Sequence, residues 1–298
     1  NARKAISVNI KADYINVDVV GLKGQIIYSM AVKAHFSKSR AYIEKLTDAV
    51  RHAVDYVGAD ADDILGVGVT VPGILDDEKQ ILISAPPLKA KNYDFTRLIS
   101  AIDYPVVVMN DARAEAYADH WFNGKPEDEK IYIMLGEGVG GAYINASAIR
   151  NGVHNRGGEF GHMVIHPGGK QCLCGKKGCF EAYVSEKVLS SELDMTLDNF
   201  FELAAQGNKN NSNVLDEYMD NLALGINNIY TMMDCDIVLG GTVAPYLKQY
   251  DNSIKERLVN DYSFDTDADY LRISDGGGRK SGLGAALSFV ARFIDGVE

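Results

Sequence analysis

The feature that most constrains this chain is a group of three cysteines, Cys172, Cys174 and Cys179, within eight residues. A histidine, His162, precedes the first of them by ten positions. Three thiolates and one imidazole match the tetrahedral Cys3His composition of structural zinc sites. Intervening glycines allow the tight turns that bring such ligands together. The pattern therefore predicts zinc bound by His162, Cys172, Cys174 and Cys179 in a loop over residues 159–181.

The loop around these cysteines is polar, which argues against inert thiols that only fill a core. Four protein ligands leave no open coordination position, so we expect the zinc to be structural and not catalytic. His166 is an alternative imidazole ligand for the same ion. The fourth cysteine, Cys235, is expected to be a packed core thiol.

Strand and helix patterns occur twice along the 298 residues, a length sufficient for two hydrophobic cores. Helical spacing over residues 43–57 is bounded by Ser39 as a cap and Gly58 as a stop, and a helix through Trp121 follows Asn110. The expected strands cover residues 6–10, 15–19, 26–30, 64–71, 106–109, 131–135, 141–144 and 236–239. The first three form an antiparallel meander covered by the first helix.

This repetition predicts an α/β protein with two similar lobes and a ligand cleft between them. We assign residues 1–115 to an N-terminal lobe and residues 116–298 to a C-terminal lobe. A last helix, at about 283–295, is expected to pack back on the N-terminal lobe.

The formal net charge of -11 repels phosphate backbones, so we do not expect these residues to bind nucleic acid. The sequence has neither an apolar run of about 18 residues nor a signal peptide, which predicts a cytoplasmic protein without membrane contact. Because the first residue is Asn1 and not Met, we expect the natural chain to begin further upstream.

Several motifs in a fixed order resemble those of the ROK family, whose name joins repressors, open reading frames and kinases. The resemblance is closest to the sugar-binding domain of its NagC/XylR-type transcriptional regulators. It implies a two-lobed fold of the actin and hexokinase (ribonuclease H-like) type. The motifs are Gly66–Gly73, Asn110–Ala116, Leu135–Gly141, Gly158–His162, Cys172–Glu181 and Ile237–Gly241.

By motif match, the resemblance also implies a set of sugar-binding residues. His162 would contact the sugar with one ring nitrogen and zinc with the other. Each residue also has a simpler interpretation, since Asn110 or Asp111 can be a helix N-cap and the two glutamates can be surface carboxylates. The implied sugar-binding residues are Gly73, Asn110, Asp111, Glu159, His162 and Glu181.

The phosphate-binding loops depart from the kinase pattern of the family, which has Asp-x-Gly-Gly-Thr in the first turn. This chain has Asn9, Lys11, Ala12 and Asp13 there, which removes the metal-binding charge and adds side chains where phosphate must approach. In the second loop Glu137, between Gly136 and Gly138, stands where kinases usually have Thr. We therefore expect no binding of ATP and magnesium.

Three functions follow from these observations. The first is a sugar-responsive repressor whose helix-turn-helix DNA-binding domain lies upstream of these residues, and the family suggests a homodimer. The second is an ATP-dependent sugar kinase of the glucokinase or fructokinase type, with Asp111 as general base, Lys11 on a phosphate and magnesium at Glu137. The third is a zinc-stabilised structural protein without a functional cleft. The sequence favours the first and leaves the identity of the sugar open.

Overall fold

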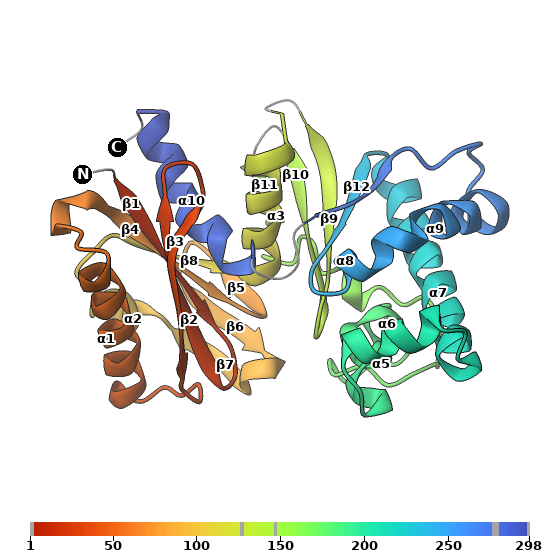
Figure 1. Ribbon diagram of the computed structural model, residues 1–298, viewed down its shortest axis with the longest axis horizontal. Coiled ribbons are helices and arrows are strands. Elements are labelled where there is room, and N and C mark those ends of the chain that lie inside the picture. Colours follow the sequence, from red (N-terminus) through yellow and green to blue (C-terminus); the bar gives the residue numbers. More distant parts are fainter. Residues whose placement is uncertain (1–2, 126–127, 146–147, 276–279, 297–298) are drawn as a thin grey trace. The chain divides into compact units, whose positions relative to one another are not determined.

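The computed structural model describes residues 3–125, 128–145, 148–275 and 280–296 (Figure 1). The chain divides into two compact units, of which the first comprises Asn1–Gly124 with Arg279–Glu298 and the second Lys125–Gly278. The division thus falls after Gly124 and not after residue 115. The reason is that helix α3 (Asp111–Asn123) is continuous and packs mainly against the C-terminal helix Lys280–Ile294, which belongs to the first unit.

A mixed sheet in the order β3-β2-β1-β4-β8 forms the centre of the first unit. The predicted antiparallel meander is confirmed, because β2 pairs antiparallel with both β1 and β3. Strands β4 and β8 continue the sheet in parallel with β1, so the three strands end at the same edge. The five strands are β1 (Lys4–Ile10), β2 (Tyr14–Gly21), β3 (Ile26–Lys33), β4 (Ile64–Val71) and β8 (Val106–Asn110).

Helices cover both faces of this sheet (Figure 1). Helix α1 (Arg40–Tyr56) packs on β2 and β3, and its N-terminus is capped by Ser39, which accepts a hydrogen bond from the Tyr42 N–H. On the other face, α10 (Lys280–Ile294) packs on α3, β1 and β4. Successive side chains of β1 point to opposite faces of the sheet, so both faces are packed. Ile6 belongs to the core under α1, and Ala5 belongs to the core under α10.

A second, three-stranded antiparallel sheet in the first unit was missed by the sequence analysis. It has the order β5-β6-β7 and is inserted between β4 and β8. Its strands are too short for an alternation pattern to stand out. The elements of this insertion are β5 (Ile74–Asp76), β6 (Ile81–Ala85), a 3-10 turn (Pro86–Leu88), β7 (Ala90–Asp94) and α2 (Thr96–Ile99).

The second unit has a five-stranded sheet in the order β11-β10-β9-β12-β13. Helix α7 (Lys209–Met233) contributes buried residues along its length to a core that includes Ile131 and Leu239 of the sheet. The strands are β9 (Glu129–Leu135), β10 (Val139–Asn145), β11 (Ala148–Ile149), β12 (Asp236–Gly240) and β13 (Leu271–Ile273). The other α-helices are α4 (Glu181–Val184), α5 (Glu186–Leu189), α6 (Leu197–Ala205), α8 (Ala244–Leu247) and α9 (Asp251–Arg257). Among the residues described, no helix combines the length and apolar character needed to cross a membrane.

Candidate functional site

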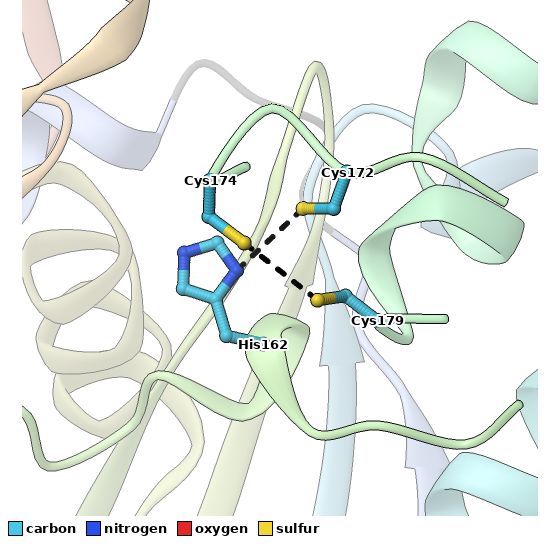
Figure 2. Close-up of side chains that lie close together, drawn as sticks. All are labelled: His162, Cys172, Cys174 and Cys179. Carbon is cyan, nitrogen blue, oxygen red and sulfur yellow. Dashed lines mark hydrogen bonds between the residues drawn. The ribbon is translucent and has the colours of Figure 1, made fainter. Parts of the chain in front are cut away.

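The four predicted metal ligands converge in the second unit (Figure 2). All four ligand atoms lie within 4.8 Å of one another. The sulfurs of Cys174 and Cys179 are 3.7 Å apart, and His162 Nδ1 is 3.9 Å from the sulfur of Cys172. A disulfide would need about 2.05 Å between sulfurs, and all three thiols are free. The arrangement is therefore a cluster that can hold one metal ion.

Backbone hydrogen bonds fold the loop into this shape. The Cys172 N–H donates to the Lys176 carbonyl at 2.8 Å, which closes the turn that carries Cys174. The Phe180 N–H donates to the Met163 carbonyl at 2.8 Å, which holds Cys179 beside the short helix Phe160–His162. Backbone hydrogen bonds of the loop thus position the ligand residues.

The alternative ligand, His166, lies outside the cluster. Its Nε2 is 2.6 Å from Oδ1 of Asn221 on α7. The neighbouring Lys170 is also attached there, through an ion pair of 3.1 Å with Glu217. His166 therefore anchors the loop to α7.

Two carboxylates that the resemblance assigned to a sugar lie beside ligands of the cluster. Glu181 Oε2 accepts a hydrogen bond of 3.0 Å from the Val139 N–H, and its Oε1 is 3.6 Å from the sulfur of Cys172. Glu159 Oε2 lies 3.8 Å from Nε2 of His162. With Nδ1 toward the cysteines and Nε2 toward Glu159, the His162 ring has the orientation that binding a metal and a second polar group at once requires.

Burial raises the pKa of the Cys172 thiol to about 12, and the nearby Glu181 carboxylate acts in the same direction. The thiolate form consequently needs a cation to compensate its charge. A metal ion at the centre of the cluster would supply that charge.

In the first unit, Gly73 and Asn110 are brought together at the ends of β4 and β8. Asn110 Nδ2 donates to the Gly73 carbonyl at 2.8 Å, and Oδ1 accepts from the Arg113 N–H at 3.0 Å. Asn110 is thus the N-cap of α3, as its simpler interpretation predicted. Its amide also fixes the Gly73 turn, so both motifs share one local structure.

Asp111 begins α3, is 6% exposed and has Lys11 as its neighbour. Lys11 Nζ lies 3.7 Å from Asp111 Oδ2. Burial raises the pKa of Asp111, while the Lys11 ammonium acts in the opposite direction. This ion pair was not predicted, because its partners are far apart in sequence and meet only where the parallel strands β1 and β8 end.

A model of the ROK family matches residues 5–290. The chain belongs to the ROK family. One relative, the xylose repressor of Bacillus subtilis (strain 168), is 28% identical over 244 residues, which cover 79% of this chain and 63% of the repressor. The chain thus matches less than two thirds of that repressor's length.

Solved structures of the ROK family share its architecture. A ROK family glucokinase from Streptomyces griseus, in complex with glucose and AMPPNP, gives a TM-score of 0.78 at 25% identity and covers 96% of this chain and 98% of the glucokinase. A ROK family transcriptional regulator, a homologue of the E. coli MLC protein, gives 0.84 at 20% identity and covers 99% of this chain and 80% of the regulator. The predicted fold of the actin and hexokinase type is confirmed.

The resemblance assigned phosphate binding in the family's kinases to two loops, one in each unit. In the first unit, Asp13 Oδ1 lies 2.8 Å from Nδ1 of His35, and Asn9 is buried. In the second unit, Glu137 is exposed at the turn between β9 and β10. Next to that turn, Glu186 donates its N–H to the Gly136 carbonyl at 2.7 Å and accepts a hydrogen bond from the Thr242 hydroxyl. The sequence analysis missed Glu186, for which no motif gave a signal.

Proposed function

We propose that this chain is the sugar-binding effector domain of a ROK-family transcriptional regulator and not a sugar kinase. The observation that carries the proposal is the ion pair between Lys11 and Asp111. In a kinase, Asp111 would take a proton from the attacking sugar hydroxyl. Burial raises the pKa of Asp111, and the Lys11 ammonium opposes that rise by stabilising the ionised form. Asp111 is thus a weaker base than burial alone would make it, and its carboxylate remains a good hydrogen-bond acceptor.

The anionic loops support the same proposal. Asp13 and Glu137 stand where a kinase would receive phosphate groups. A carboxylate about 4 Å from a negatively charged phosphate group repels it by roughly 4 kcal/mol at an effective dielectric constant near 20. A repulsion of that size would weaken triphosphate binding by orders of magnitude.

The proposed effector is a sugar bound through hydroxyl groups. The ligands we propose in the first unit are Gly73, Asn110 and Asp111, and in the second unit Glu159, His162 and Glu181. Hydrogen bonds to charged groups are worth about 1.5 to 3 kcal/mol each, so a few of them are enough for selectivity.

We infer that the metal is zinc and that its role is structural. Tetrahedral zinc with Zn–S bonds of about 2.3 Å places two sulfurs about 3.8 Å apart. The 3.7 Å between Cys174 and Cys179 agrees with that value. Zinc would fix the His162 ring and would balance the charge of the Cys172 thiolate, so that the Glu181 carboxylate can stay beside it. Two of the proposed sugar ligands would thereby keep their positions.

The regulator in this proposal acts as a cytoplasmic homodimer and contacts DNA through a helix-turn-helix domain upstream of these residues. The similarity to a xylose repressor that is longer than this chain supports it. Sugar binding would shift the population of conformers and so the spacing of two DNA-reading helices.

The alternative is an ATP-dependent sugar kinase, supported by the likeness to the glucokinase solved with glucose and AMPPNP. Calorimetry and a coupled kinase assay with ATP, magnesium and a panel of pentoses, hexoses and N-acetylhexosamines separate the two functions. We expect heat from a sugar, no heat from ATP and no turnover. Phosphorylation at about 1 to 100 per second, the usual range for kinases, would overturn the proposal.

A second experiment tests regulation directly. The full-length protein is titrated against DNA from upstream of its own gene, with and without the sugar that gives heat. We expect the sugar to change DNA affinity, with Asp111→Asn insensitive to it. A sugar that binds without any effect on DNA affinity would contradict the regulatory role.

A further inference from the structure

We propose that Lys11 and Asp111 form a donor–acceptor pair that binds one free hydroxyl of an uncharged sugar and rejects the same sugar when that hydroxyl carries a phosphate. This inference rests on the proposed function and deepens it, since it names the chemical class of the effector. It assigns Lys11 a role in specificity that none of the motifs indicates.

Only one oxygen of the Asp111 carboxylate is directed toward Lys11. Oδ1 accepts hydrogen bonds from the Ala112 N–H at 3.0 Å and from Asn110 Nδ2 at 3.3 Å. Oδ2 is the oxygen near Lys11 Nζ. The acceptor available to a ligand is therefore Oδ2, with an ammonium group beside it.

The distance between the two groups leaves room for a third atom. Lys11 Nζ and Asp111 Oδ2 are 3.7 Å apart, longer than a direct hydrogen bond of about 2.7 to 3.2 Å. One oxygen atom can lie about 2.8 Å from both of them. A hydroxyl in that position accepts from the ammonium and donates to the carboxylate, so it satisfies both groups.

The backbone holds Lys11 in place. Its N–H donates to the Tyr14 carbonyl at 3.0 Å and closes the turn between β1 and β2. The next residue is fixed as well, since the Phe36 N–H donates to the Ala12 carbonyl at 2.8 Å. The Lys11 side chain is 32% exposed, so its ammonium remains accessible, whereas the Asp111 side chain is 8% exposed.

A phosphate ester fits this pair poorly. It carries a charge of about -1.5 to -2 at neutral pH and is largely deprotonated, so it rarely has an O–H group that can donate a hydrogen bond to Asp111. The single charge of Lys11 is already balanced by Asp111, so the pair offers no net positive charge. A neutral hydroxyl group meets neither difficulty.

Calorimetry of the full chain tests the inference with unmodified sugars and their phosphates, for example D-glucose, D-glucose 6-phosphate and D-glucose 1-phosphate, with the corresponding pentose set. We expect at least about tenfold weaker binding when the contacted hydroxyl is phosphorylated, and about tenfold weaker binding of the free sugar by Lys11→Met, the loss of roughly one charge-assisted hydrogen bond. Lys23→Met, in the exposed turn between β2 and β3, is the matched control and should bind like the wild type.

Lys11→Met leaves the buried Asp111 carboxylate unpaired and can destabilise the fold, so the double variant Lys11→Met, Asp111→Asn provides an uncharged pair of similar size. It should fold and bind the sugar weakly. A phosphorylated sugar that binds more tightly than the free one, or a folded Lys11→Met that binds like the wild type, would overturn the role of Lys11 and leave the proposed function intact. A wild-type chain that binds no sugar of the panel would overturn both.

Discussion

The carboxylate of Glu181 lies 3.6 Å from the sulfur of Cys172. Its second oxygen accepts the N–H of Val139, at the start of β10. One side chain thus connects the metal cluster to the glycine-rich turn of the second unit. Loss of the metal should therefore change the sugar-binding residues as well as the stability of the loop.

Removing one metal ligand tests this connection. We expect Cys174→Ser to lose the bound metal, to unfold at a lower temperature and to bind sugar more weakly, because Glu181 and His162 are no longer held. Metal content by atomic emission, thermal unfolding and calorimetry measure the three effects. Cys235→Ser, which changes a thiol outside the cluster, should keep the metal. Sugar affinity that survives complete loss of the metal would contradict the connection.

The metal loop contains a glycine, Gly178, at which a side chain would clash with the backbone. Gly178 has a φ of +83°, and a Cβ there would lie 1.7 Å from the His166 carbonyl oxygen. Gly175 is a matched control, with a φ of +89° and nothing within 4 Å of a Cβ. In both variants an alanine must adopt the left-handed backbone conformation, which costs about 1 to 2 kcal/mol of stability. Only Gly178→Ala adds a steric clash to that cost.

We expect Gly178→Ala to lower the free energy of unfolding by about 3 kcal/mol or more and to release the metal, and Gly175→Ala to retain it. Urea unfolding and metal analysis provide the comparison. Equal effects of the two substitutions would show that the contact with His166 does not matter.

The pH dependence of sugar binding should report on Asp111. Burial raises the pKa of this carboxyl group, and its ionised form accepts a stronger hydrogen bond from a sugar hydroxyl than its protonated form does. Affinity should therefore be full above the raised pKa and fall as the pH drops through it, at a pH above the usual carboxyl value of about 4. Calorimetry across pH measures the transition.

Two variants complete that experiment. Asp111→Asn should bind weakly at every pH, whereas Asp62→Asn, an exposed carboxylate of the same unit, should leave the curve unchanged. An unaltered transition in Asp111→Asn would assign the titration to another group.

Glu181→Gln separates charge from position. The amide oxygen can still accept the Val139 N–H, so we expect the metal to be retained while sugar affinity falls by about 1.5 to 3 kcal/mol. The exposed Glu192→Gln serves as the control and should have no effect. Metal loss in Glu181→Gln would mean that the carboxylate charge stabilises the cluster itself.

The sequence predicted those parts of the molecule that depend on near neighbours. The metal cluster could be predicted because its ligands lie within eighteen positions in one loop. Helix α1 could be predicted because Ser39 caps it and its apolar face is continuous. The insertion β5–β7 escaped detection, since strands of three to five residues around Pro86 show no clear period.

Contacts between distant residues were not predictable in the same way. His166 pairs with Asn221 across 55 positions, and Lys11 meets Asp111 only because parallel pairing brings the ends of β1, β4 and β8 to one edge. A single sequence does not show which distant strands pair with one another or at which residues their ends meet. These are also the contacts on which the proposed chemistry depends.

The return of α10 to the first unit has a consequence for biosynthesis. Leu283, Leu287 and Val290 of this helix complete a core with Ala5 and Ala118, which leave the ribosome much earlier. The second unit lies between them in the chain and contains its own core, so it can fold first. The first unit cannot complete this core until α10 has been translated, so a truncation before α10 would damage the part of the protein that was made first.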